Sequence, residues 1–357
     1  MLPWTKMAMR QKEESEMAWY NESGKNESTV LATRVRFARN LADYPFTGRL
    51  SSAGATEVIE RVKAALPEYG AVNFSSLSAP EAQSYVERHY VSPTFTDKRL
   101  PRVLLTGEGE RVQIMLCEED HVRIQSIVPG FDPQSAFEAA CRADDQLCSK
   151  LKIAFDPELG YLTHCPTNLG NAMRVSAMMF LPGLTMLGRI EGLSPGLNKL
   201  GMTIRGMYGE GSRAEGNIYQ ISNSGSLGVS EADVIKNFTD VINRVTELEE
   251  GARKTVFKAD EDRLTDRIYR SLGILKSAYL LSSDEMTNKL SDVRLGCALG
   301  IVEKLPLCKL TELSVATQPA TMMLSGEGLE DDRARDKARA KLVKGTFEAF
   351  SEGSDRL

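Results

Sequence analysis

Residues 28–41 read STVLATRVRFARNL, a stretch in which β-branched and apolar residues alternate with arginine. This period of two predicts a β-strand whose successive side chains point to opposite faces. Arg34 and Arg36 then share one face, and Arg39 lies off that face. We therefore expect a strand that presents two cations to one side of a sheet.

The segments around this strand predict both helices and strands. Residues 103–130 contain two or three apolar runs separated by glycines and by a short acidic run, which indicates a β-meander. Two further strands are predicted for MTIRGMYG (202–209) and GNIYQISN (216–223), around a glycine-rich loop. Another helix is predicted to begin near Gly170 and to end or kink at Pro182. Amphipathic spacing predicts helices at 56–66, 79–90 and 133–152.

The pattern becomes purely helical in the last third of the chain. Ser230 can cap a long helix that runs through about residue 250. No convincing alternating strand follows it, so we place a domain boundary near 251–258. Further helices are predicted near 260–280, 283–299, 308–317 and 330–350.

Length and composition describe an ordinary soluble globular protein. The 357 residues favour two domains, and 44 Lys plus Arg against 49 Asp plus Glu give a formal net charge of −5. This balance excludes a whole-chain attraction to nucleic-acid backbones. Charges interrupt the N-terminal stretch, so we expect no export signal and a cytoplasmic location. The six cysteines contain no C-x-x-C pair and, with three histidines, provide no zinc-type spacing.

Glycine-based phosphate motifs do not occur in the sequence. Neither G-x-x-x-x-G-K-[ST] nor G-x-G-x-x-G is present, so we do not predict a backbone phosphate cradle. Arginine is the alternative, because its planar fork matches phosphate oxygens and keeps its charge. Each arginine alone is also consistent with a weak surface ion pair, but together they indicate an anion site. The candidates are Arg34, Arg36, Arg123, Arg174 and Arg205.

Three other features could carry chemistry. The acidic run Glu118–Asp120 can place a carboxylate at a cleft, although such runs are usually solvated turns. Cys165 would become a thiolate if a helix N-terminus followed it; an inert buried cysteine is the alternative. The loop GMYGEGSRAEG (206–216) carries Glu210 and Glu215 and could close over a ligand, although surface loops often have this composition.

In this order and spacing the sequence resembles the catalytic domain of the phosphagen (guanidino) kinases, and most closely their bacterial protein-arginine kinase branch. The resemblance is carried by TRVRFARNL, EEDHVRIQ, YLTHCPTNLGNAMR and RGMYGEG. It implies an α+β fold, with an antiparallel β-sheet flanked by helices, followed by an all-helical domain. The implied division is an N-terminal arm (1–27), a catalytic domain (28–255) and a helical phosphoarginine-binding and dimerisation domain (256–357).

The resemblance also implies roles for single residues. Glu119 matches the catalytic carboxylate, Cys165 the thiol beside the substrate guanidinium, and Glu210 a second acidic residue on the closing loop. The implied nucleotide-binding residues are Thr33, Arg34, Arg36, His121, Arg123, Arg174 and Arg205. The sequence RDKARA (335–340) matches a phosphoarginine-binding motif, with Arg335, Asp336, Arg339 and Ala340 as its residues. A charged helix face in solvent is the alternative for that segment.

The sequence also departs from the pattern of the family. Only 32 residues precede Thr33, too few for the helical N-terminal domain of the free-guanidino kinases. Cys117 stands where the family pattern has Asn, Ala32 where Ser is usual, and Asn171 with Ala172 where Thr-Gly is common. These departures affect the substrate site and turnover more than the reaction type, because the charged groups are retained.

The implied activity is ATP-dependent phosphorylation of arginine side chains in proteins, with ATP and Mg²⁺. The resemblance further implies a homodimer that acts in protein quality control and the stress response. Its implied partners are an activator protein, a heat-shock transcriptional repressor and a Clp protease, with no direct nucleic-acid or membrane partner. Two alternatives remain open: a free-arginine phosphagen kinase, and a catalytically poor adaptor that binds phosphoarginine or a transcriptional repressor.

Overall fold

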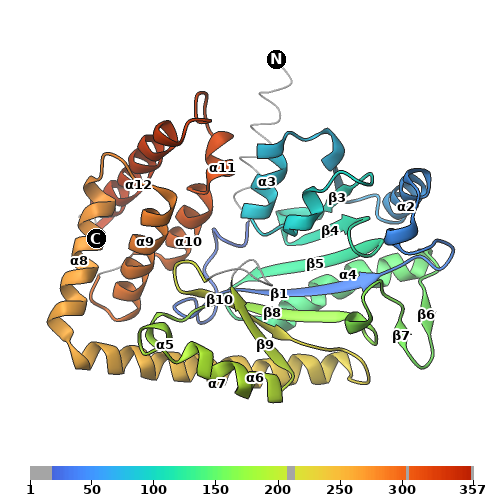
Figure 1. Cartoon of the computed structure of the whole chain (residues 1–357), viewed down its shortest axis with the longest axis horizontal. Helices are drawn as coiled ribbons and strands as arrows, with labels where there is room; N and C mark the ends of the chain where they lie inside the picture. The colour runs from blue at the N-terminus through green and yellow to red at the C-terminus, as the bar shows by residue number, and fades with distance from the viewer. Residues whose placement is uncertain (1–17, 207–213, 303–304, 355–357) are drawn as a thin grey trace.

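The computed structural model describes residues 18–206, 214–302 and 305–354, which are built around an eight-stranded sheet (Figure 1). Neighbouring strands all pair antiparallel, in the order β2-β3-β4-β5-β1-β8-β10-β9. The predicted antiparallel sheet is confirmed. Its strands are β1 (Val30–Arg39), β2 (Gly70–Asn73), β3 (Val103–Thr106), β4 (Val112–Leu116), β5 (Val122–Pro129), β8 (Met173–Phe180), β9 (Met202–Gly206) and β10 (Ile218–Asn223). A small hairpin joins β6 (Phe155–Asp156) to β7 (Gly160–Tyr161).

Helices flank the sheet, as predicted. They are α2 (Ser52–Ala65), α3 (Ala79–Glu87), α4 (Pro133–Lys150), α5 (Pro182–Met186), α6 (Ile190–Lys199) and α7 (Glu231–Ala259). The buried side chains of α2, α4 and α7 form one core with β1 and β5, so these helices cover the same face. Short 3-10 helices lie at Thr47–Arg49, Phe74–Ser76, Pro93–Thr96, Glu108–Glu110 and Pro166–Asn168.

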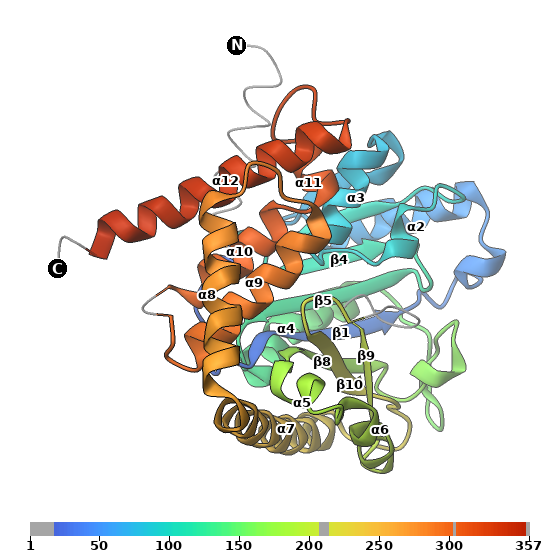
Figure 2. The same ribbon diagram turned by 60° about the vertical axis from the view of Figure 1, so that its left-hand side comes forward.

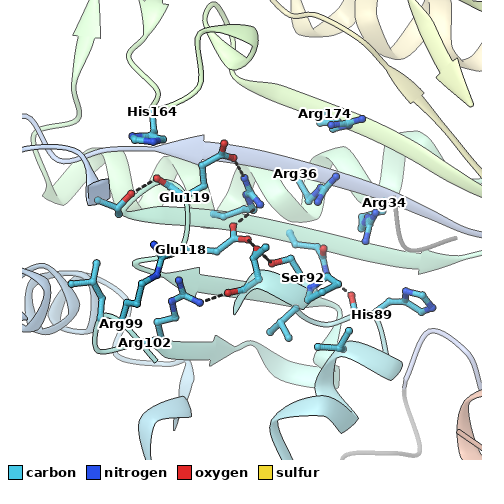
Figure 3. Close-up of a pocket in the computed structure, with 18 of the residues that line it drawn as sticks. Arg34, Arg36, His89, Ser92, Arg99, Arg102, Glu118, Glu119, His164 and Arg174 are labelled. Carbon is cyan, nitrogen blue, oxygen red and sulfur yellow. Dashed lines mark hydrogen bonds and ion pairs between the residues drawn. The ribbon is translucent and has the colours of Figure 1, made fainter. Parts of the chain in front are cut away.

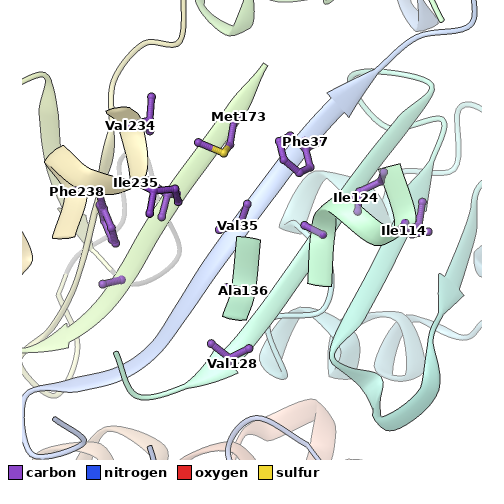
Figure 4. Packing of buried hydrophobic residues seen from close by; sticks show 14 of the residues in the cluster. Val35, Phe37, Ile114, Ile124, Val128, Ala136, Met173, Val234, Ile235 and Phe238 are labelled. Carbon is purple, nitrogen blue, oxygen red and sulfur yellow. The ribbon is translucent and has the colours of Figure 1, made fainter. Parts of the chain in front are cut away.

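The central strand β1 separates the two faces of the sheet by simple alternation. Val35 and Phe37 point into the core beneath α4 and α7 (Figure 4). Arg34 and Arg36 point to the opposite face, where they line a pocket. Arg39 instead turns towards α4, and its guanidinium forms a buried ion pair with Asp144 at 2.6 Å. The prediction of a strand with two cations on one face is therefore confirmed.

The C-terminal region is helical throughout its described residues (Figure 2). It contains α8 (Glu261–Ser277), α9 (Ser283–Ala298), α10 (Leu307–Ala316), α11 (Pro319–Met323) and α12 (Asp332–Ser354). The start of α11 docks on α3, because Glu87 accepts hydrogen bonds from the main-chain nitrogens of Ala320 and Thr321 at 2.9 and 2.7 Å. This buried carboxylate joins the helical region to the sheet region.

The prediction of a helix beginning near Gly170 is wrong. Residues 173–180 form β8, which lies between β1 and β10. Arg174 and Ser176 alternate with core residues at the start of this strand, but residues 177–180 (AMMF) are apolar and buried on both faces, so the second half of the run loses the alternation that identifies a strand. Pro182 does not end a helix there; it begins α5.

The long helix α7 begins after its predicted cap, Ser230, whose side chain accepts a hydrogen bond from the main-chain nitrogen of Asp233. It continues to Ala259, beyond the predicted end near residue 250. The proposed boundary at 255/256 therefore lies within its last turns, and the division into domains stays a prediction. Among the described residues, no helix is both long and apolar enough to cross a membrane.

Candidate active site

A pocket of about 890 Å³ opens on the face of the sheet opposite α4 (Figure 3). Its floor is formed by β1, β5, β8, β9 and β10, and its rim by segments that follow β1, α3, β4 and β7. All five predicted phosphate-binding arginines line it: Arg34, Arg36, Arg123, Arg174 and Arg205. Side chains that are separated by up to 171 positions in the sequence thus meet in one cavity.

Strand register explains why these arginines meet. Arg36 lies opposite Gln125 of β5 on one side and opposite Arg174 of β8 on the other. Arg205 of β9 lies opposite Gln220 of β10. Residues directly opposite each other share a face of the sheet, so the register gathers the guanidinium groups on the pocket floor. Like charges placed directly opposite destabilise a sheet, which indicates that this floor is arranged for an anion.

The electrostatics of the floor are those of crowded cations. Burial, with the nearby charges of Arg174 and Arg123, lowers the pKa of Arg34 to about 10. Burial, and then Arg34, Arg123 and Arg174, lower the pKa of Arg36, and Glu118 opposes them. Arg34 donates to the neutral side-chain oxygen of Gln220 at 2.8 Å. No hydrogen bond joins the Arg36 guanidinium to any other group in the described part of the chain.

Two carboxylates stand beside this cationic floor. Glu118 and Glu119 both pair with Arg123, at 2.5 and 2.6 Å. Burial alone would lower the pKa of Arg123, but these carboxylates outweigh it and raise the pKa. Glu118 is 3% exposed as a side chain, whereas Glu119 is 37% exposed and faces the pocket. Glu119 is therefore the carboxylate that a second substrate can reach.

Glu118 is held in its charged form by the loop after α3. Ser92 and Thr94 both donate their hydroxyl groups to Glu118, Thr94 at 2.7 Å. Burial alone would raise the pKa of Glu118, but Arg123, Ser92, Thr94 and Arg36 together lower it. Glu118 is therefore a charged, immobilised carboxylate that positions Arg123 through their ion pair.

Comparisons with known proteins agree with this geometry. A family model for the C-terminal catalytic domain of ATP:guanido phosphotransferases matches residues 54–252, and a model for the C-terminal domain of the protein-arginine kinase McsB matches residues 261–356. A protein-arginine kinase from Symbiobacterium thermophilum is 37% identical over 97% of this chain and 99% of that relative. Another, from Bacillus subtilis (strain 168), is 38% identical over 92% of each chain.

The chain belongs to the protein-arginine kinase family. Solved guanidino kinases share its fold. Lombricine kinase superposes with a TM-score of 0.57 and 21% identity, covering 66% of this chain and 70% of that one. The duplicated taurocyamine kinase of Schistosoma mansoni, with bound components of a transition-state analogue, gives 0.57 and 22%, covering 72% and 38%. At this level of identity the likeness supports the fold alone.

Several residues to which the family assigns roles lie away from the pocket lining. Thr33 is buried and donates to the main-chain oxygen of Gly130 at 2.7 Å. His121 is also buried: its Nδ1 accepts from the main-chain nitrogen of Leu41, and its Nε2 lies 2.9 Å from the oxygen of Pro45. Any contribution of these two to nucleotide binding would be indirect. Their roles stay predictions.

The two other predicted substrate residues have different outcomes. Cys165 is half-buried, does not line the pocket, and lies 3.0 Å from the hydroxyl of Thr167. The predicted helix N-terminus after it is wrong, because only a 3-10 turn at Pro166–Asn168 and then strand β8 follow. Glu210 lies outside the described residues.

The pocket also contains residues that the sequence analysis missed. Gln125 and Gln220 lie on the pocket face of β5 and β10, and the same period of two that located the arginines would have found them. His89 and His164 arrive on irregular segments after α3 and β7, for which the sequence holds no periodic signal. Burial, and then the charge of Arg34, lower the pKa of His89 to about 3, so this imidazole is neutral.

The departures from the family pattern coincide with unusual backbone. Cys117 has φ of 61° and Ala172 has φ of 52°, both in the left-handed region. Asn and Gly, the residues usual at these positions, are the two that adopt this region most easily. Cys and Ala adopt it with strain. The altered residues therefore add backbone strain next to the pocket without removing a charge.

The predicted phosphoarginine motif lies on α12, and its arginines are buried rather than exposed. Arg335 and Arg339 are 8% and 1% exposed. Arg335 donates to the main-chain oxygens of Leu329 and Glu330 and pairs with Asp332. Arg339 donates to the oxygens of Thr317 and Leu281 and to Asp336. The alternative of a solvent-facing charged helix face is excluded for these two side chains.

Proposed function

We propose that the protein transfers the γ-phosphoryl group of ATP to arginine side chains of other proteins. The observation that carries the proposal is the single pocket in which five arginines stand beside the half-exposed carboxylate of Glu119. Membership of the protein-arginine kinase family supports the choice of acceptor. Phosphoryl transfer depends mainly on alignment and charge stabilisation, which a site made of charged clamps supplies.

The arginine floor serves as the donor half of this site. Arg34, Arg36, Arg123 and Arg174 lie close enough for their charges to lower the pKa values of Arg34 and Arg36, and a triphosphate would relieve this mutual repulsion. Mg²⁺ is expected to arrive as part of the substrate MgATP, because this ion binds through phosphates and few protein groups. No cluster of three metal-binding side chains occurs among the described residues.

Glu119 serves as the base of the acceptor half. The pKa of an arginine guanidinium is above about 12, so the group is protonated at neutral pH and is then a poor nucleophile. In the structure Arg123 holds Glu119, and phosphate oxygens that bind Arg123 would compete for it and release the carboxylate. Glu119 then accepts a guanidinium proton while the nitrogen–phosphorus bond forms and ADP leaves with the electrons of the broken phosphorus–oxygen bond. From the family we further propose that Cys165 and Glu210 contact the guanidinium.

The test is a transfer assay with ATP and an arginine-rich protein, in which acid-labile phosphate is measured. We expect Glu119→Gln to reduce transfer by at least about a hundredfold and to leave ATP binding intact. Glu138→Gln, on the exposed face of α4, is the matched control and should transfer normally. Normal transfer by Glu119→Gln would refute the assignment. A parallel assay with free arginine tests the phosphagen kinase alternative.

The wider cellular role is proposed from the family. The protein would mark substrates for a Clp-type protease, act on a heat-shock transcriptional repressor, respond to an activator protein and form a homodimer. Phosphorylated substrate should then be degraded by the protease faster than substrate treated with Glu119→Gln enzyme. Equal degradation of both would remove the marking role.

A phosphoarginine-binding role for residues 335–340 also stays a proposal. Asp332, Asp336 and main-chain oxygens occupy Arg335 and Arg339, so a phosphate group must displace these partners. A phosphoarginine peptide should bind the wild-type protein and not Arg335→Ala. Equal binding by both proteins would exclude this role and the adaptor alternative that depends on it.

A further inference from the structure

His164 lies at the edge of the pocket, next to Glu119 (Figure 3). Its backbone is fixed, because its main-chain nitrogen donates to Asp120 at 2.7 Å, and Asp120 also accepts from Asn40 at 2.7 Å. Its side chain is exposed to the pocket. The imidazole meets the ring of Phe46 edge to face, with 6.2 Å between ring centroids. This side chain has no role in the function proposed above.

The ring rests on a glycine. A Cβ atom at position 48 would lie 2.9 Å from Cε1 of His164, so only the bare backbone of Gly48 leaves room for the imidazole. The preceding residue, Thr47, donates its hydroxyl to the main-chain oxygen of Glu119. The segment 46–48 therefore ties together the imidazole and the backbone of the proposed base, and the ring is positioned rather than loose.

The position of His164 within the pocket separates it from the donor half. In Figure 3, Glu119 lies between His164 and the arginines at positions 34, 36 and 174. The cationic floor suits a triphosphate, which leaves the space beside Glu119 and His164 for the acceptor. The acceptor group is a planar cation, and guanidinium groups stack on aromatic faces.

We propose that His164, supported by Gly48 and Phe46, forms an aromatic wall that holds the guanidinium of the acceptor arginine against Glu119. This proposal rests on the proposed function and adds a substrate-binding residue to it. An aromatic face suits this position better than a third carboxylate. A carboxylate would stabilise the protonated guanidinium strongly and oppose the proton transfer, whereas a ring face orients the group with a weaker preference for its charge.

Substitutions at His164 test this wall with an arginine peptide as acceptor. His164→Ala should raise the KM for the peptide by about two- to thirtyfold and leave the KM for ATP unchanged. His164→Phe keeps a ring face and should restore the peptide KM to near the wild-type value, whereas His164→Lys should repel the guanidinium and give the largest increase. A wild-type peptide KM in His164→Ala would overturn the proposal. A defect in His164→Phe as large as that in His164→Ala would also overturn it, by assigning the role to the ring nitrogens.

A binding measurement separates this proposal from the proposed function. Binding of the arginine peptide in the presence of ADP, followed by fluorescence anisotropy, should weaken in His164→Ala and not in His164→Phe. Binding that depends on His164 without any transfer to the peptide would refute the proposed function and keep the wall. Transfer to the peptide, combined with binding that does not depend on His164, would refute the wall and keep the proposed function.

Gly48→Ala provides a second test that leaves the ring in place. The added methyl group must displace the imidazole, so we expect a rise in the peptide KM that is smaller than in His164→Ala. Gly192→Ala is the matched control, because nothing lies within 4 Å of a Cβ at that helical position. Equal peptide KM values for the two glycine variants would show that contact with Gly48 does not position the His164 ring.

Discussion

The arginines of the sheet floor and those of α12 looked alike in the sequence and differ in the structure. Arg34 and Arg36 lie close together, Arg34 beside the neutral oxygen of Gln220, and their pKa values are lowered by burial and by other cations. Arg335 and Arg339 are more completely buried, among main-chain oxygens, and each pairs with an aspartate one turn away. In the first set the neighbouring cations outweigh the one opposing carboxylate, Glu118, and the set is arranged for a ligand. The second set already has its partners and supports the fold.

This difference shows that the surroundings of an arginine, rather than its spacing, indicate its role. Buried cations require compensation, and a protein supplies it either internally or through a bound anion. Removing an arginine of the first kind should therefore damage activity, and removing one of the second kind should damage stability. The following predictions test that separation.

Removal of Arg36 should have the largest effect. We expect Arg36→Ala to lower kcat/KM for ATP by about 10³-fold, because a charge that stabilises the transferring phosphoryl group is lost. Its urea unfolding midpoint should be unchanged or higher, since the buried guanidinium repels Arg34, Arg123 and Arg174. Arg111→Ala, on the exposed surface beside Glu22, is the control for loss of one positive charge. A marked fall in the unfolding midpoint of Arg36→Ala would show that this arginine of the sheet floor stabilises the fold, which would contradict the comparison.

Removal of Arg339 should show the opposite pattern. Arg339→Ala leaves the oxygens of Thr317 and Leu281 without a donor, and we expect a loss of about 2–3 kcal/mol in the free energy of unfolding of the helical region. Urea denaturation followed by circular dichroism measures this loss. Arg333→Ala, exposed on the same helix, should change stability by less than about 0.5 kcal/mol. Equal stability of the two variants would mean that α12 does not need its buried arginine.

The pH dependence of stability tests the charge of Arg34 from a neighbouring residue, because this charge helps to lower the pKa of His89. The pKa of His89 is lowered to about 3 in the folded protein, against about 6.5 in an unfolded chain. The unfolded chain therefore binds a proton first as the pH falls. The stabilisation is complete above pH 6.5 and is lost between pH 6.5 and 3. Between pH 7 and 5 this amounts to about 2 kcal/mol.

Urea titrations at pH 7 and 5, in buffers without phosphate, measure this effect. His89→Asn is the matched variant, because Asn does not titrate and tolerates the left-handed backbone at this position, where φ is 62°. The variant should lose about 2 kcal/mol less than the wild-type protein over this interval. An identical loss in both proteins would show that His89 is not held neutral.

The sequence predicted most of the fold where one side of an element is buried and the other is not. Arg34 and Arg36 alternate with Val35 and Phe37, so period two located β1 and its cationic face. Strand β8 was missed because its second half, residues 177–180, is apolar and buried on both faces, which hides the period of two that Arg174 and Ser176 show before it. The pairing of β1 with β8 and β5 joins distant segments, which local patterns do not reveal.

The site was predictable to the extent that strands build it. All five arginines were identified, and the register then brought them together. His164 and His89 were missed because loops carry them, and loop positions depend on tertiary contacts such as the seat on Gly48. The burial of Arg335 and Arg339 was also missed, because the sequence RDKARA does not show which main-chain oxygens lie opposite the helix.

The last and smallest prediction concerns backbone strain, in which the two regions also differ. Among the described residues, every non-glycine residue with positive φ precedes α7, and Ala172 is one of them. Left-handed backbone costs an L-residue about 1–2 kcal/mol. A new glycine lowers the free energy of unfolding by about 0.4–1 kcal/mol, because it gives the unfolded chain more conformational entropy. Loss of the Ala172 methyl group also removes packing, which reduces the net gain in stability. Ala172→Gly should therefore be as stable as the wild-type protein or more stable by at most about 1 kcal/mol.

Ala64→Gly, at an exposed position near the end of α2, carries the same cost in the unfolded chain without any strain to relieve. It should be less stable than the wild-type protein by about 0.5–1 kcal/mol. The two variants thus differ in the sign of their effect, which thermal unfolding can resolve even where each effect is small. Equal destabilisation by both would show that Ala172 adopts its backbone conformation without strain.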